Sequence, residues 1–154
     1  MSNEFLDSLE NLDTLNVSDF IKFSQRGIEK ENLRSSKCSI SLKAHPKAYG
    51  SSLTNSRITT DFSEALIELV TSPNKDLNNC LKELEDIVYF CLKNTDEDFW
   101  PASIPMSIED EATIPIADYG STNSGKLKKL YRVGLSHRYG SMMQTVSGIH
   151  YNFS

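Results

Sequence analysis

Two glutamates, at positions 29 and 31, are the first residues whose types and spacing suggest chemistry. They lie in a stretch, residues 27–34, whose pattern is typical of a short β-strand. Side chains two residues apart on a strand share a face, with Cα atoms about 6–7 Å apart. Two carboxylates held in this way can bind one hard cation or two neighbouring ones. From spacing alone, a solvent-facing strand that displays its charges is the commoner explanation.

A second group of acids follows at Asp61, Glu64 and Glu68. Glu68 stands between Ile67 and Leu69, in a stretch apolar enough to form a central strand. A carboxylate there is costly to bury unless it is paired or bound to a metal. Glu68 is therefore expected either to bind a metal or ligand or to form a structural ion pair, and the sequence leaves both open.

His150 and the loop 119–126 are weaker indications of a functional site. His150 alternates with Gly148 and Asn152 on one face of the last predicted strand, where a lone histidine is more often structural than catalytic. The loop 119–126 has the glycine and hydroxyl content of an anion-binding helix start, but it lacks the Walker A spacing. No nucleophile triad or zinc spacing is recognisable, so the oxygen-rich acids favour Mg²⁺ or Mn²⁺.

Hydrophobic periodicity predicts the elements that must position these side chains. Strands are expected over 28–33, 38–42, 57–60, 65–71 and 145–154, and helices over 4–12, 19–24, 76–94 and 125–142. The segment 95–118 carries three prolines and is expected to be irregular. We expect the 76–94 helix to bury Cys80 and Cys91, about 16 Å apart along its axis. The 125–142 helix is expected to turn Leu127, Leu130, Tyr131 and Leu135 inward.

Composition sets the broad class. The chain has 154 residues, a net charge of -5, 38% hydrophobic and 24% charged residues, which favours one globular domain without an internal boundary. Its longest apolar run, Ile87–Leu92, is far too short to span a membrane, and its acidic start does not fit a signal peptide. Three cysteines without a C-x-x-C pattern favour a reducing, cytoplasmic compartment. Nucleic acid is not an expected partner of so acidic a chain.

Read as whole strings, several segments resemble the proteobacterial type of the bacterial glutamate–cysteine ligase family. The matching segments are Gln25–Arg34, His45–Pro46, Gly50–Thr54, Ile58–Glu68, Trp100–Pro101, Ser103–Pro105, and Tyr119–Gly120 onward through Leu130–Gly140 to Met143–Ser154. The similarity covers almost the whole chain from residue 25, and its final block is the most specific. Lys30 and Lys126 stand where arginine is common in the family, and Ser121-Thr122 reverses the usual order.

The resemblance implies an ATP-dependent ligase that joins the γ-carboxylate of L-glutamate to the amine of L-cysteine through γ-glutamyl phosphate, the first step of glutathione biosynthesis. Mg²⁺ or Mn²⁺ would offset the phosphate charges. Carried over residue by residue, the resemblance makes Glu29, Glu31, Asp61, Glu68 and His150 the metal-binding set. It places Tyr131 and Gln144 on the cysteine side. The implied fold is α+β, an antiparallel sheet with flanking helices, related to glutamine synthetase.

Proteins of this family are several times longer. We therefore expect residues 1–154 to be the N-terminal part of a single catalytic domain, incomplete at its C-terminus because the last predicted strand has no turn or cap after it. Two alternatives stay open, another carboxylate–amine ligase with a different acceptor and an inactive truncated domain. The block 131–154 favours the cysteine-specific family. The isolated chain is expected to have no ligase activity.

Overall fold

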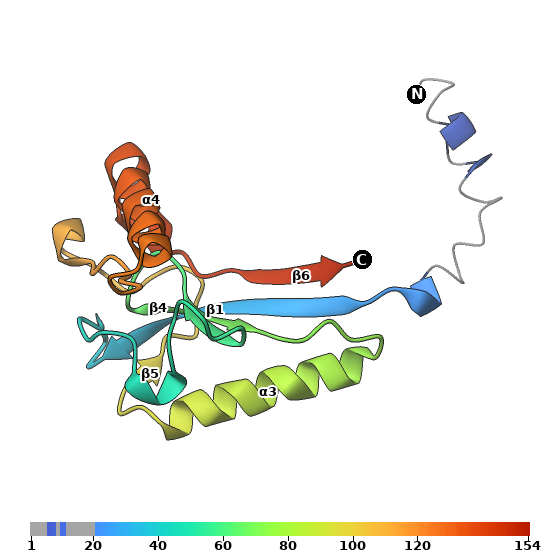
Figure 1. Cartoon of the computed structure of the whole chain (residues 1–154), viewed down its shortest axis with the longest axis horizontal. Coiled ribbons are helices and arrows are strands. Elements are labelled where there is room, and N and C mark those ends of the chain that lie inside the picture. The colour runs from blue at the N-terminus through green and yellow to red at the C-terminus, as the bar shows by residue number, and fades with distance from the viewer. Residues whose placement is uncertain (1–5, 9, 12–20) are drawn as a thin grey trace.

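An antiparallel sheet of six strands organises the chain, and its longest strand, β1 (Arg26–Ser36), pairs with four of the other five. The computed structural model describes residues 6–8, 10–11 and 21–154 (Figure 1). The remaining described strands are β2 (Ser39–Ile40), β3 (Ile58–Thr60), β4 (Leu66–Val70), β5 (Asp98–Phe99) and β6 (Ile149–Phe153). The helices are α3 (Leu77–Lys93), α4 (Asn123–Tyr139) and the short 3₁₀ turns η1 (Lys47–Tyr49), η2 (Glu111–Thr113) and η3 (Met142–Thr145).

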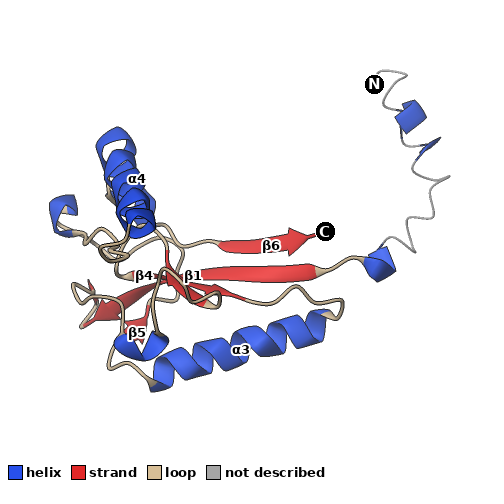
Figure 2. Cartoon of the chain, in the orientation of Figure 1, coloured by secondary structure: helices blue, strands red, loops and turns tan. Residues whose placement is uncertain are grey.

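The predicted α+β class and the antiparallel sheet are confirmed (Figure 2). Of the two helices predicted near the N-terminus, over 4–12 and 19–24, residues 6–8, 10–11 and 21–23 are helical. Ser24 is described and is not helical, and the other residues of both predicted helices lie outside the described residues. No helix in the part of the chain that the structure describes is long and apolar enough to cross a membrane.

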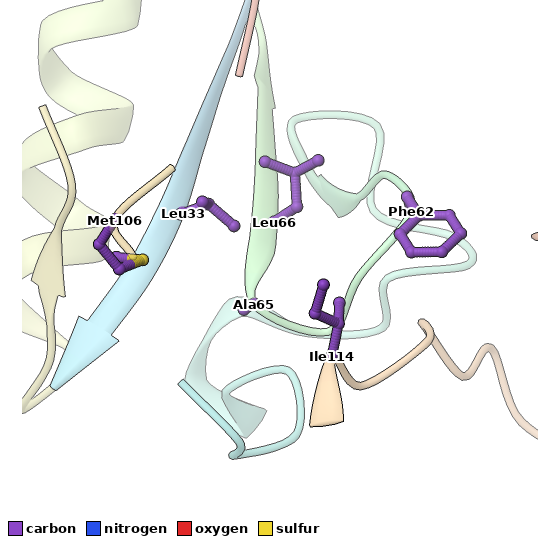
Figure 3. Close-up of a cluster of buried hydrophobic side chains, with 6 residues drawn as sticks. All are labelled: Leu33, Phe62, Ala65, Leu66, Met106 and Ile114. Carbon is purple, nitrogen blue, oxygen red and sulfur yellow. The ribbon is translucent and has the colours of Figure 1, made fainter. Parts of the chain in front are cut away.

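The two faces of the sheet have different surroundings because side chains alternate along each strand. On one face, Ile67 and Leu69 of β4 pack with Ile58 and Cys91 against α3, which runs along β1 and β4 in Figure 1. On the other face, a cluster around Leu33 and Leu66 covers one end of these strands; its other buried members are Phe62, Ala65, Met106 and Ile114 (Figure 3). Glu29, Glu31 and Glu68 continue this second face beyond the cluster.

The helix predicted over 76–94 is confirmed as α3. Its N-cap is Asp76, whose side chain accepts a hydrogen bond of 2.8 Å from the Asn78 backbone N–H. Cys80 and Cys91 are both fully buried free thiols, as expected. Because α3 packs on the face of the sheet that carries Ile67 and Leu69, it does not cover Glu31 and Glu68 on the opposite face.

The expectations for α4 were wrong in two respects. The helix begins at Asn123 instead of 125, because the Thr122 side chain accepts the Gly125 backbone N–H at 3.1 Å, and it ends at Tyr139, before Gly140 with φ 80°. Of the side chains expected to face inward, only Leu135 packs against the core. The other three, Leu127, Leu130 and Tyr131, are 68%, 66% and 63% exposed. Apolar spacing indicates which residues share a helix face but not which face is covered.

Two strands are shorter than predicted and one is longer. The strand expected over 38–42 is only Ser39–Ile40, because Lys37 and Cys38 adopt left-handed φ values of 51° and 62° in a tight hairpin turn. The strand expected over 145–154 begins only at Ile149, since Met142–Thr145 forms the turn η3. By contrast β1 covers Arg26–Ser36, beyond the predicted 28–33, because four strands pair along it in the sheet.

Candidate functional site

The strand register brings four of the five predicted metal-binding residues onto one face. Glu31 on β1 lies directly opposite Glu68 on β4, and Glu29 lies directly opposite His150 on β6. Directly opposed residues in antiparallel strands have Cβ atoms about 4.5–5.5 Å apart. The shared face of Glu29 and Glu31 was predicted from their spacing, whereas the pairing with Glu68 and His150 depends on the sheet.

Asp61, the fifth predicted residue, reaches the same region from the end of β3. Thr59 lies opposite Glu68, and Asp61 is two residues further along, so alternation turns it toward the same face. Its backbone N–H donates to the Leu66 carbonyl at 3.0 Å, which holds it beside the start of β4. The negative charge of Asp61 contributes to raising the pKa of Glu68.

The Glu68 carboxylate is destabilised in its charged form. Burial raises its pKa above the ordinary value, and the charges of Asp61, Glu29 and Glu31 raise it further, while only His150 opposes them. Among the described residues, no hydrogen bond or ion pair to this carboxylate is found. The structural ion pair that the sequence left open for Glu68 therefore has no partner here.

The neighbouring carboxylates are oriented by polar groups of β6 and the loop before it. Glu29 accepts a hydrogen bond of 2.9 Å from the Asn152 side-chain amide and lies 3.2 Å from His150 Nδ1. This contact with Glu29 raises the pKa of His150 above its ordinary value. Glu31 accepts the Gly148 backbone N–H at 2.7 Å, and a Cβ at Gly148 would come within 2.9 Å of His150 Nε2. Only glycine fits at position 148 without moving the histidine.

The donor set fits a hard divalent cation in chemistry. Carboxylate oxygens with one imidazole are the ligands that Mg²⁺ and Mn²⁺ accept, and their mutual repulsion is what a cation would relieve. Within the described ranges, no three histidine, cysteine or acidic side chains are already gathered as a metal-binding group. Strand register therefore places the candidate ligands on one face, and the side chains would turn from their present partners to bind.

Tyr131 and Gln144, predicted on the cysteine side, lie apart from the sheet. Tyr131 is 63% exposed on α4, on the same outward side as Leu127 and Leu130, along a shallow groove with a volume of about 310 Å³. Gln144 is half-buried in η3. The end of α4 is joined to the start of η3 by a hydrogen bond of 2.8 Å between the hydroxyls of Ser136 and Ser141. The groove side of Tyr131 is open to a ligand.

The structure adds residues that sequence reasoning did not single out. Asn152 binds Glu29, and its place beside His150 on one strand face was the signal that could have identified it. Tyr119 and Arg132 hold Asp61 through its backbone carbonyl, which no local pattern could reveal because Arg132 and Asp61 are 71 residues apart.

Glu64, by contrast, is a structural residue. Its buried carboxylate accepts the backbone N–H groups of His45, at 2.6 Å, and Asp118, at 2.5 Å, and thereby joins two loops. The anion-binding loop considered over 119–126 is partly helical, since α4 begins at Asn123. Neither feature contributes a side chain to the acidic face.

Fold and site together define an α+β chain with four acidic side chains on one face of an antiparallel sheet. The family model for glutamate–cysteine ligase matches residues 9–154. A glutamate–cysteine ligase from Saccharophagus degradans is 50% identical over 131 residues, 84% of this chain and 25% of its own length. One from Aliivibrio fischeri is 44% identical over 153 residues, 98% of this chain and 29% of its own length.

Two solved structures share the fold. The crystal structure of glutamate–cysteine ligase from Francisella tularensis in complex with AMP has a TM-score of 0.82 and 46% identity, covering 85% of this chain and 27% of that one. A bifunctional glutathione synthetase from Pasteurella multocida has a TM-score of 0.78 and 30% identity, covering 89% of this chain and 18% of that one. This chain belongs to the glutamate–cysteine ligase family, and it spans about a quarter of the length of the curated relatives it matches.

Proposed function

We propose that this chain supplies the acidic sheet face of an enzyme that joins the γ-carboxylate of L-glutamate to the amine of L-cysteine with ATP, by way of γ-glutamyl phosphate. Membership of the glutamate–cysteine ligase family supports the reaction. The observation that carries the proposal is the strand register that sets Glu31 opposite Glu68 and Glu29 opposite His150 on one face of the sheet. Burial and the neighbouring acids raise the pKa of Glu68, which agrees with this arrangement. Such a face binds cations and, with them, phosphate groups.

The chain's own residues would hold the cation and orient its ligands. Glu29, Glu31, Asp61, Glu68 and His150 are the proposed Mg²⁺ or Mn²⁺ ligands. When bound, the metal would offset the charge of the transferring phosphoryl group and of the leaving ADP. Asn152 and the Gly148 backbone N–H keep Glu29 and Glu31 directed along this face. The carboxylates would exchange these partners for the cation when it binds.

Substrate partners follow from the same proposal. The nucleotide is supported by the AMP bound to the Francisella tularensis ligase, which has the same fold over this segment. Tyr131 and Gln144 are the proposed cysteine-side residues, and the exposed ring of Tyr131 is available for that contact. A reducing cytoplasm suits a thiol substrate and the three free cysteines of the described chain.

The test uses a full-length carrier, in which residues 1–154 replace the matching segment of the Saccharophagus degradans ligase. We expect phosphate release from the carrier to require glutamate, cysteine, ATP and Mg²⁺ together. The isolated 154-residue chain should release none, because it spans only about a quarter of such an enzyme. Turnover with another amine in place of cysteine would support a different carboxylate–amine ligase. A folded carrier without any turnover would contradict the proposed function.

A further inference from the structure

Asp61 is held in place by two side chains from distant parts of the chain. The Tyr119 hydroxyl donates to the carbonyls of Thr60 and Asp61, over 2.6 Å and 2.9 Å. The Arg132 Nε–H donates to the same Asp61 carbonyl. Tyr119 is 5% exposed, and the Arg132 side chain is 13% exposed, so these donors are shielded from competing water. The end of β3 is therefore fixed at the residue proposed to bind metal.

The two donors also support each other. The Arg132 guanidinium carbon lies 4.7 Å from the centroid of the Tyr119 ring, a distance at which a cation is attracted by the ring face. Arg132 belongs to α4 and Tyr119 to the segment just before it, so the contact ties the helix to the Asp61 loop. Tyr131, the proposed cysteine-side residue, directly precedes Arg132 on the same helix.

The Arg132 guanidinium donates to the backbone carbonyl of Asp61 and leaves the Asp61 carboxylate largely free to bind a cation. Arg132 Nη2 lies 3.7 Å from Asp61 Oδ1, which is close enough for an ion pair but too far for a hydrogen bond. The Asp61 side chain is 46% exposed. Arg34, the buried arginine on the opposite face of β1, bonds the Glu97 carboxylate itself, and both side chains are 1% exposed. Arg34 thus neutralises a carboxylate directly, whereas Arg132 bonds the backbone of Asp61 and not its carboxylate.

We propose that Arg132, with Tyr119, is a positioning residue that orients Asp61 for cation binding. This inference rests on the proposed function, since it takes Asp61 to be a ligand. Groups that orient a metal ligand influence metal affinity, and their loss typically weakens binding by about 10-fold or more. The contact between Arg132 and Asp61 thereby links the proposed metal ligands to the proposed cysteine-side residue Tyr131, which is the neighbour of Arg132 on α4.

The test measures Mn²⁺ affinity of the full-length carrier directly, from the paramagnetic resonance signal of free Mn²⁺. Arg132→Lys keeps the positive charge and removes the planar fork, so the electrostatic effect on the cation is held constant. Tyr119→Phe removes the hydroxyl donor without any change of charge. We expect each variant to raise the dissociation constant about 10-fold. Arg57→Gln, which breaks the ion pair of 3.3 Å with Glu83, is the structural control and should lower Tm without changing Mn²⁺ affinity.

The Asp61→Asn background separates the possible outcomes. In it, Arg132→Lys should have no further effect on Mn²⁺ affinity, because the ligand that Arg132 orients is already lost. An undiminished effect of Arg132→Lys in this background would overturn the positioning role, as would normal Mn²⁺ affinity of Arg132→Lys when Asp61→Asn alone weakens binding. If Asp61→Asn alone leaves Mn²⁺ affinity unchanged, both the metal assignment in the proposed function and this inference fail.

Discussion

The two faces of β1 carry two ionisable groups of opposite character, only a few residues apart. On one face, Arg34 pairs with Glu97 and donates to the carbonyls of Lys43, Ala44 and Glu64 at 2.8 Å, 3.1 Å and 2.8 Å. On the other face, Glu31 and Glu68 oppose each other, with like charges around them. The first group is internally neutral. On the acidic face, Arg132 lies 3.7 Å from the Asp61 carboxylate and His150 lies 3.2 Å from Glu29, but no described cation pairs with Glu31 or Glu68.

This difference separates stabilising residues from functional ones. A buried pair of opposite charges, hydrogen-bonded to the surrounding loops, holds those loops in place and has no free charge for a ligand. Two shielded carboxylates that face each other without a counter-ion, as Glu31 and Glu68 do, cost free energy in the metal-free chain, and a bound cation would relieve that cost. The contrast therefore predicts that substitutions on one face change stability and those on the other change metal binding and turnover.

The largest expected effect is on the acidic face. Glu31→Gln keeps the shape of the side chain and removes one negative charge opposite Glu68. We expect Mg²⁺-dependent turnover of the full-length carrier to fall at least about 100-fold, since a clamp on a transferring phosphoryl group is worth several kcal/mol. Steady-state phosphate release measures the change. Glu85→Gln, an exposed site on α3, is the matched control and should leave turnover unchanged.

The next effect concerns the buried pair on the opposite face. Glu97→Gln leaves the Arg34 guanidinium buried without a counter-charge, and we expect a loss of about 3–5 kcal/mol in unfolding free energy. Urea unfolding of the carrier gives the value. The double variant Arg34→Met, Glu97→Leu should lose far less, because no charge remains buried. Equal losses in the single and double variants would mean that packing, and not charge compensation, explains this cluster.

A smaller effect is expected at the cysteine side. Tyr131→Ala and Gln144→Ala should each lower kcat/KM for cysteine by about 10-fold and change that for ATP little, because a contact made only with the acceptor appears only in its kinetics. Tyr131 is exposed, so its loss should not unfold the chain. Initial rates with each substrate varied in turn decide the matter. Equal losses for ATP, glutamate and cysteine would show that these residues are structural.

The smallest effect is a pH dependence beside the buried pair. Burial, together with the Arg34 charge, lowers the pKa of His45 from 6.5 to about 4, and neither ring nitrogen has a hydrogen-bond partner among the residues that the structure describes. Below pH 6.5 the unfolded chain takes up this proton more readily than the folded chain does, so stability should fall as the pH drops from 6.5 toward about 4. Tm across this range measures it. His45→Phe, which keeps the ring contact with Tyr49, should flatten the slope.

The fold class, one helix and part of the acidic face could be predicted from local features of the sequence. The α+β class, the helix 76–94 with its two buried cysteines and the common face of Glu29 and Glu31 could all be predicted, because each depends on local periodicity. The resemblance to the ligase family was confirmed by the family model. The metal-binding and cysteine-side assignments stay predictions.

What the sequence could not show depends on long-range contacts or on unusual turns. The outward orientation of Leu127, Leu130 and Tyr131 depends on which side of α4 meets the core. A Ser/Lys turn before residue 38 could be predicted, but the left-handed φ values place Cys38 inside the turn, and residues of these types rarely adopt such values. Arg132 and Asp61 are 71 residues apart in the sequence, so no local sequence pattern could predict their contact.

One measurement tests the central claim, that the acidic face is built for a cation and not for stability. Glu68→Gln removes a carboxylate whose raised pKa means that it increasingly destabilises the metal-free fold as the pH rises above 4.5. At pH 7, the metal-free variant should therefore have a Tm equal to or above that of the parent carrier, and it should bind Mn²⁺ at least about 10-fold more weakly. A lower metal-free Tm together with unchanged Mn²⁺ affinity would contradict the account.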